Sequence, residues 1–227
     1  MIPLKDNVPT RSFPIITITL ILVNIFIFVW YFTLPPEAER GLISRYALVP
    51  KELLVSFTSR PELAPYNCLT VMTSMFLHAG IFHVAGNVLY LWIFGHNVED
   101  AMGHFRFIFF YLASGVAAAL VQVSFDPASS APMIGASGAV SGILGAYLLL
   151  YPWAKVKTLI FILVFITTVE IPALVLLTFW FFFQIIFSHG QGVAWFAHIG
   201  GFIFGMITIK LFTLRVRQKR KVARAAR

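Results

Sequence analysis

The sequence predicts an all-α polytopic membrane protein, a bundle of six transmembrane helices. Of its 227 residues, 59% are hydrophobic and only 11% are charged, whereas a soluble globular domain has about a quarter of its residues charged. Several apolar runs approach the ~20 residues that cross a bilayer. The unbalanced positive charge lies in short segments between and after these runs, which is typical of the cytoplasmic side of a membrane protein.

The first apolar run extends from Ile15 to Leu34 and is stopped by Pro35-Pro36. It is too long for a removed signal peptide and lacks a small-residue cleavage site. The following segment, Glu37 to Asn67, holds four acidic and four basic residues and several prolines. We expect it to be a structured loop on the membrane surface and not a separate domain.

The remaining runs alternate with charged or turn-rich segments, so the chain is expected to form one membrane domain over residues 1–214. The expected spans are residues 15–34, 77–98, 107–125, 137–153, 171–187 and 195–214. Residues 215–227 are expected to form a basic cytoplasmic tail, because eight basic residues and no acidic one follow from Lys210 onward. A basic segment directly after an apolar span favours an anchor on anionic lipid over a site for nucleic acid.

The region from Thr158 to Phe187 allows two interpretations, because it is apolar apart from Glu170. Either two short spans flank Glu170, or Ile171 to Phe187 crosses alone and Thr158 to Val169 lies in the interface. Twelve residues of helix rise only ~18 Å, which is short for the ~30 Å hydrocarbon core. The single crossing is preferred, and it places both termini and the Lys155/Lys157 turn in the cytoplasm.

A small-residue stretch, Gly135-Ala-Ser-Gly-Ala-Val-Ser-Gly-Ile-Leu-Gly145, opens the fourth span. Small side chains let a neighbouring helix approach closely, and the last span offers Gly201 and Gly205 for such a contact. Ser137 lies between glycines that leave its hydroxyl sterically open. Such a serine can also simply cap the start of the helix.

With six crossings, the spans that carry His83, Ser137 and His198 near their starts all run in the same direction. These residues are therefore expected at similar depth, near the outer face. A weak alcohol nucleophile needs an adjacent base, which His198 can provide for Ser137. Asn87 follows His83 by four residues and shares its helix face, so the two could stabilise an oxyanion. Alternatively, His83 bonds only a carbonyl or a water, and Asn87 only joins two helices.

Three stretches of the chain resemble the signatures of the rhomboid intramembrane serine proteases: Gly135-Ala-Ser137-Gly138, His83-Val-Ala-Gly-Asn87 and Ala197-His198-Ile-Gly-Gly201-Phe-Ile-Phe-Gly205. The resemblance implies a six-helix bundle with a serine–histidine dyad and no aspartate. In it Ser137 is the nucleophile and His198 is the general base and then the general acid. His83, Asn87 and the backbone N–H of Ser137 form the oxyanion hole. No cofactor or metal is expected, since the one cysteine, Cys68, forms no metal-site pattern.

The chain departs from this resemblance one helical turn after the nucleophile. Some members of the family have there an aromatic residue that stacks on the catalytic histidine, whereas this chain has Ser141. The packing that orients His198 must therefore come from another part of the chain.

Access to a site below the outer surface requires movable parts. The fifth span is the natural lateral gate, and Trp180 is expected to close the gap over the small surface at Ala85 and Gly86 of the second span. The loop from Ser188 to Phe196 contains Gly190 and Gly192, which permit unusual backbone angles. Its movement is expected to uncover the site from above.

The sequence thus predicts an intramembrane serine endopeptidase in a bacterial plasma membrane, acting on transmembrane segments of membrane proteins. The alternative is a catalytically inactive, rhomboid-like binding or quality-control factor, which would typically have lost Ser137 or His198. A channel or transporter would show repeats or intramembrane carboxylates, and Glu170 is the one candidate. A haem-binding bundle could use His83 and His198 as axial ligands, but it would not explain Gly135-Ala-Ser-Gly.

Overall fold

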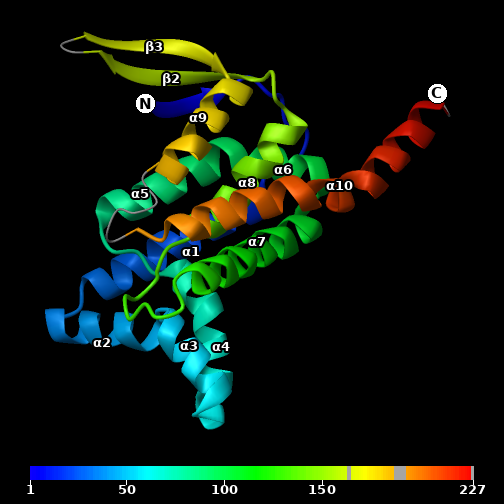
Figure 1. Ribbon diagram of the computed structural model, residues 1–227. Helices are drawn as coiled ribbons and strands as arrows, with labels where there is room; N and C mark the ends of the chain where they lie inside the picture. Colours follow the sequence, from blue (N-terminus) through cyan, green and yellow to red (C-terminus); the bar gives the residue numbers. More distant parts are fainter. Residues whose placement is uncertain (163–164, 187–192, 226–227) are drawn as a thin grey trace.

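The computed structural model describes residues 1–162, 165–186 and 193–225, and it is mostly helical (Figure 1). Among these residues three helices are long and apolar enough to cross a membrane, and two segments with an 81° bend between them, Pro61–Phe76 and Ile81–Met102, pass the same test only when taken together. Two shorter apolar helices complete the bundle. In chain order the bundle consists of α1 (Ile15–Phe32), α5 (Ile81–Tyr90), a π-helical turn (Leu91–Gly95), α6 (His96–Met102), α7 (His104–Phe125), α8 (Ser137–Leu150), α9 (Ala173–Ile186) and α10 (Trp195–Ala225).

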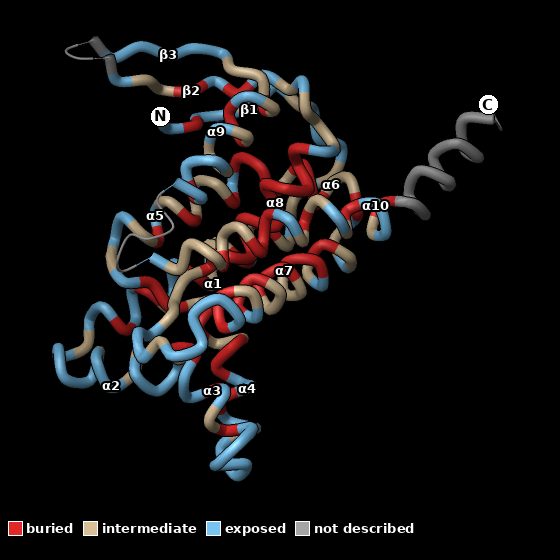
Figure 2. Tube along the Cα trace, in the orientation of Figure 1, coloured by how far each residue is buried: buried red, intermediate tan, exposed pale blue. Residues whose placement is uncertain are grey.

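Helix α8 is the centre of the bundle, and the predicted helical membrane fold is confirmed. Every residue from Gly138 to Leu148 is buried, and Figure 2 shows the buried residues gathered on α8 and on the facing sides of α7 and α10. Its 14 residues rise only about 21 Å, less than the ~30 Å hydrocarbon core. Because protein surrounds α8, its ends do not have to reach both membrane surfaces.

Helices α8 and α10 approach backbone to backbone, as the small residues predicted. A methyl group added at Gly201 would lie 2.1 Å from the carbonyl oxygen of Gly138, and one at Gly205 would lie 1.9 Å from that of Gly142. No side chain fits into either gap. The glycines therefore set the distance between the two helices that carry Ser137 and His198.

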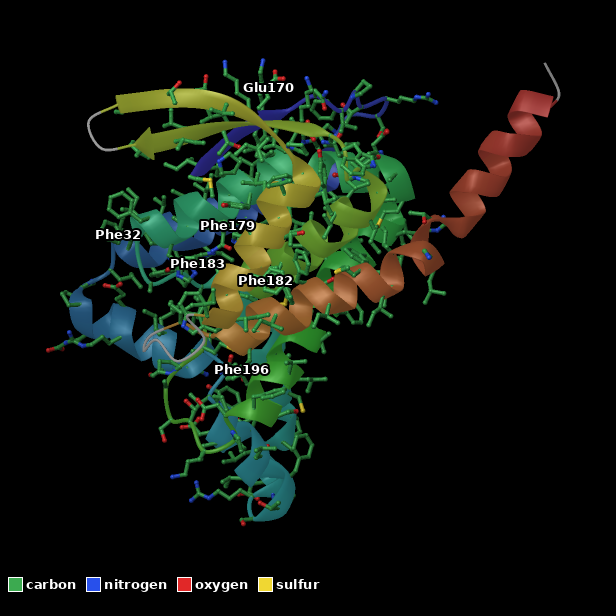
Figure 3. The ribbon with its side chains drawn as sticks, turned by 45° about the horizontal axis from the view of Figure 1, so that its top comes forward. Phe32, Glu170, Phe179, Phe182, Phe183 and Phe196 are labelled. Carbon is green, nitrogen blue, oxygen red and sulfur yellow. The ribbon has the colours of Figure 1, made fainter. Side chains whose placement is uncertain are left out.

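A three-stranded antiparallel sheet stands beside α9, so the prediction of a purely helical protein was incomplete (Figure 1). Its order is β1 (Ile2–Asp6), β2 (Lys155–Ile162) and β3 (Phe165–Pro172). The segment from Thr158 to Val169 therefore belongs to a β-hairpin, in which β-branched side chains favour extended backbone. Glu170 lies on β3 (Figure 3) and forms an exposed ion pair with Lys155 at 3.3 Å, so this carboxylate lies outside the helices of the bundle.

Two carboxylates, the half-buried Asp6 and the buried Glu99, join the N-terminal segment to the bundle. Asp6, at the end of β1, accepts hydrogen bonds from Nδ2 of Asn97 at 2.6 Å and from the hydroxyl of Tyr147 on α8. Glu99, which is fully buried on α6, accepts from the backbone N–H groups of Ile16 and Thr17 at 3.0 and 2.8 Å. A carboxylate at this position satisfies N–H groups that have no partner within α1.

The segment between the first two spans is structured, as expected, and it consists of short helices. They are α2 (Pro36–Tyr46), α3 (Pro50–Thr58), a 3₁₀ turn (Pro61–Leu63) and α4 (Ala64–Thr73). Prolines stand in the first turns of these elements, where a missing N–H costs nothing. Side chains such as Asn67, which donates to the carbonyl of Glu52 at 3.0 Å, hold the helices together.

Candidate active site

Ser137 and His198 are in hydrogen-bond contact. Ser137 is the first residue of α8, and its Oγ lies 2.8 Å from Nε2 of His198 in the first turn of α10. Among the described residues no side chain caps the start of α8, so the capping interpretation of Ser137 is wrong. The hydroxyl is directed at an imidazole on the adjacent helix, as the close approach of α8 and α10 requires.

A cavity of about 490 Å³ opens beside this pair. Its walls come from α5, α8, α9 and α10, and they include His83, Asn87, Ser137 and His198. All four residues that the sequence singled out for chemistry therefore lie at one cavity. Much of the remaining wall is apolar, with Phe82, Tyr90, Val140, Leu144, Trp180 and Phe183 among its residues.

A hydrogen bond from the backbone just before α5 orients the ring of His83. Its Nδ1 accepts from the N–H of Ala79 at 3.3 Å, which leaves the hydrogen of the neutral ring on Nε2. A methyl group added at Gly135 would lie 2.7 Å from this Nε2 and 3.6 Å from Oγ of Ser137. Gly135 also has a φ of +125°, which L side chains rarely adopt. The glycine thus lets the histidine donor stand beside the serine.

Asn87 lies one turn further along α5. Its Nδ2 donates to the carbonyl of His83 at 3.0 Å. The amide carries two N–H hydrogens, and one remains for a group in the cavity. Because this hydrogen bond joins two residues of α5, it does not support the alternative that Asn87 only links two helices.

Sequence reasoning missed Gln184, which contacts His198 from α9. Its Oε1 lies 2.8 Å from Nδ1 of His198, so both ring nitrogens of the histidine have partners and neither is free to bind a haem iron. One signal was present: Gln184 is the single amide in α9, which is otherwise apolar apart from Thr178, and intramembrane polar side chains are costly and usually functional.

Two tryptophans supply the packing that an aromatic residue at position 141 would have given. The rings of Trp180 and Trp195 lie 6.3 and 6.0 Å from the His198 ring, centroid to centroid. Ser141 instead donates from Oγ to the carbonyl of Ser137 at 2.6 Å. The histidine is thus packed by residues of α9 and α10.

The arrangement at the expected gate differs from the prediction in one contact. Trp180 and Gly86 line the same cavity, but Trp180 packs against His198 and Phe202, with 5.8 Å between its ring centroid and that of Phe202. A methyl group added at Gly86 would meet no described atom within 4 Å, so Trp180 does not cover this surface. Gly190 and Gly192 of the expected access loop lie outside the described residues.

Three phenylalanines of α9 are exposed in part, whereas Phe181 stacks on Phe202 of α10, with 4.8 Å between the ring centroids. Phe179, Phe182 and Phe183 lie along α9 (Figure 3), and 41–55% of each is exposed.

Among the described residues no three His, Cys, Asp or Glu side chains gather to hold a metal ion, and Cys68 is exposed. The chemistry that the site can perform with its own groups is base-assisted attack by a hydroxyl.

Comparison with known proteins identifies the family. Residues 66–215, more than half of the chain, match the family model of the Rhomboid domain. The chain is 40% identical over 99 residues to the rhomboid protease GluP of Bacillus subtilis, covering 43% of this chain and 19% of that protein. It is 29% identical over 171 residues to the presenilin-associated rhomboid-like protein A, mitochondrial, of Danio rerio, covering 71% and 42%. It is 33% identical over 150 residues to RHOMBOID-like protein 1 of Arabidopsis thaliana, covering 64% and 34%.

In each comparison the chain spans less than half the length of the relative. Members of this family are typically intramembrane serine proteases. The apolar helices likewise make the protein a multi-pass membrane protein. The chain belongs to the rhomboid family.

Proposed function

We propose that the protein is an intramembrane serine endopeptidase that hydrolyses peptide bonds in or near transmembrane segments with a Ser137–His198 dyad. The observation that carries the proposal is the 2.8 Å contact between Oγ of Ser137 and Nε2 of His198, at a cavity whose lining combines these polar groups with apolar side chains. A serine and a histidine within hydrogen-bond reach form the activated nucleophile of acyl-transfer enzymes.

The reaction follows from these positions. His198 accepts the Ser137 proton at Nε2 while Oγ attacks the carbonyl carbon of the scissile bond. The tetrahedral intermediate then collapses, the C–N bond breaks, and the imidazolium gives its proton to the leaving amine. A water molecule, activated by the same Nε2, hydrolyses the acyl-enzyme and restores Ser137.

Three donors can stabilise the oxyanion of that intermediate: Nε2–H of His83, Nδ2–H of Asn87 and the backbone N–H of Ser137. The last of these is one of the first N–H groups of α8, which have no partner within their helix. The N-terminus of a helix also favours negative charge. Donors fixed in place before the reaction stabilise charge better than water does, since they need not reorient.

The substrate class follows from the cavity and its setting in the membrane. The apolar walls suit a segment that arrives from the lipid. A transmembrane helix hides its carbonyls in internal hydrogen bonds, so cleavage favours segments that unwind easily near their outer end. By family resemblance, we expect the substrate to have a small residue immediately before the scissile bond.

A labelling experiment tests the proposal without any substitution. Purified protein is incubated with a panel of transmembrane peptides, with and without prior treatment with a fluorophosphonate. We expect cleavage of some peptides, loss of that cleavage after treatment, and one modified residue, Ser137, by mass spectrometry. A catalytically inactive relative would give neither cleavage nor label, and a label on another serine would contradict the assignment.

We further propose six crossings, with both termini on the cytoplasmic side of a bacterial plasma membrane. Three long helices, one bent helix pair and two shorter apolar helices support this number. The basic residues of α10 that follow Thr213, together with Lys155 and Lys157 of β2, then lie on the side favoured by positive charge.

Thiol labelling in intact cells checks this topology. With Cys68 replaced by serine, a cysteine at Arg40 in α2 should react with an impermeant reagent. One at Gln218 should react only after the membrane is permeabilised. Equal labelling of both positions from outside would rule out the six-span arrangement.

A further inference from the structure

Both ring nitrogens of His198 are engaged, and their partners have different roles. Nε2 lies 2.8 Å from Oγ of Ser137, and Nδ1 lies 2.8 Å from Oε1 of Gln184. A neutral imidazole carries one hydrogen, so one nitrogen donates while the other accepts. To take a proton from Ser137, Nε2 must be the acceptor, and Nδ1 must then carry the hydrogen.

The glutamine is oriented to receive that hydrogen. Its Nε2 donates to the carbonyl of Trp180 at 3.4 Å on the preceding turn of α9. A carbonyl can only accept, so the NH₂ end of the amide faces Trp180 and the oxygen faces His198. The reverse orientation would set two acceptors together at Trp180 and two donors together at Nδ1.

Gln184 is buried in an apolar environment, so its hydrogen bond to His198 is needed to pair its oxygen. The side chain is 5% exposed, and the rest of α9 is apolar apart from Thr178. A buried amide is costly unless its polar atoms are paired, and here its oxygen is paired with the histidine. In the protonated ring that forms during catalysis, the same bond becomes charge-assisted and therefore stronger.

We propose that Gln184 is the positioning residue of the dyad, which holds His198 in the tautomer and orientation that accept the Ser137 proton. This inference rests on the proposed protease function. It also explains what orients His198 in a chain that has Ser141 in place of an aromatic residue. The polar contact of the histidine comes from Gln184 on α9 and not from position 141 on α8. Since α9 is also a wall of the cavity, the base is complete only while α9 packs against α10.

Two nearly isosteric substitutions separate the hydrogen bond from packing. Gln184→Met removes the acceptor and keeps the volume, whereas Gln184→Glu keeps an acceptor oxygen at the same reach. We expect Gln184→Met to slow fluorophosphonate labelling of Ser137 by about ten- to hundredfold, the scale of one hydrogen bond to a group that becomes charged. Gln184→Glu should stay within about threefold of the wild-type rate on the same scale. Peptide cleavage by Gln184→Met should show a lower kcat with little change in KM.

Thermal unfolding of the same variants excludes a merely structural role. A buried glutamate is harder to accommodate than methionine, so Gln184→Glu should unfold at a lower temperature than Gln184→Met although it reacts faster. Gln122→Met is the matched control, since Gln122 is 8% exposed and its Oε1 accepts from the N–H of Ala197, next to the histidine, at 3.2 Å. Gln122→Met should lower the unfolding temperature, because the N–H of Ala197 loses its acceptor, but it should leave the rate of Ser137 labelling in the folded protein unchanged.

The outcomes are distinct. Labelling of Gln184→Met at the wild-type rate, or equal slowing of Gln184→Met and Gln184→Glu, would overturn the positioning role. Absence of Ser137 labelling in the wild type would instead overturn the proposed function.

Discussion

Replacement of Ser137 or His198 by alanine is expected to lower the cleavage of transmembrane peptides at least about 10⁴-fold, as in serine proteases that lose a member of their catalytic group. Ser137→Ala removes the nucleophile. His198→Ala leaves the hydroxyl without the acceptor that lies 2.8 Å away. The double variant should lose little more than either single variant, because residues that act as a unit are not additive.

Cleavage rates of purified variants in detergent, together with fluorophosphonate labelling, measure this effect. Ser124→Ala and His96→Ala are suitable controls, since Ser124 donates to the carbonyl of Leu120 and His96 contacts the carbonyl of Trp92, both within their own helical segments. Both should cleave at the wild-type rate. Normal cleavage by folded Ser137→Ala would exclude the serine-protease mechanism.

A single methyl group at Gly205 is expected to disrupt the bundle. Gly205→Ala would place a Cβ 1.9 Å from the carbonyl oxygen of Gly142 and 2.9 Å from its Cα. The backbone cannot move aside as a flexible side chain would, so α8 and α10 must separate. The free energy of unfolding should fall by about 3 kcal/mol, at the upper end of overpacking effects. Activity should be lost with it, because α10 carries His198 away from Ser137.

Gly41→Ala is the matched substitution for this test. Gly41 lies in α2, and a Cβ there would meet no described atom within 4 Å. Alanine should be favoured at this helical position by about 0.5–1 kcal/mol. Thermal unfolding in detergent should therefore give a lower midpoint for Gly205→Ala and an unchanged or higher one for Gly41→Ala. Equal midpoints for Gly205→Ala and the wild type would contradict the close approach of α8 and α10.

Much of the fold followed from local pattern. Apolar runs of bilayer length predict helices without knowledge of their neighbours, because every backbone polar group in lipid must be satisfied within the segment. Glycine spacing predicted the contact between α8 and α10, since only small residues permit it. The hairpin at β2 and β3 was missed because short apolar segments look alike as helix or strand. Its partner β1 lies about 150 residues earlier in the chain, and the antiparallel pairing of Ile2 with Leu159 is not visible in either segment alone.

The candidate site divides in the same way. By itself the sequence determined the candidate dyad, Ser137 and His198, and the shared helix face of His83 and Asn87, because spacing and the direction of the spans limit where these side chains can lie. Only the tertiary structure decided what supports His198. Gln184 and Trp180 reach the histidine from α9, and the rotation of α9 about its own axis depends on packing against α8 and α10. The weak amphipathic pattern of α9 does not indicate which side faces its neighbours. The amide of Gln184 marks one polar position on this helix, but its contact with the dyad became visible only when the helices were placed together.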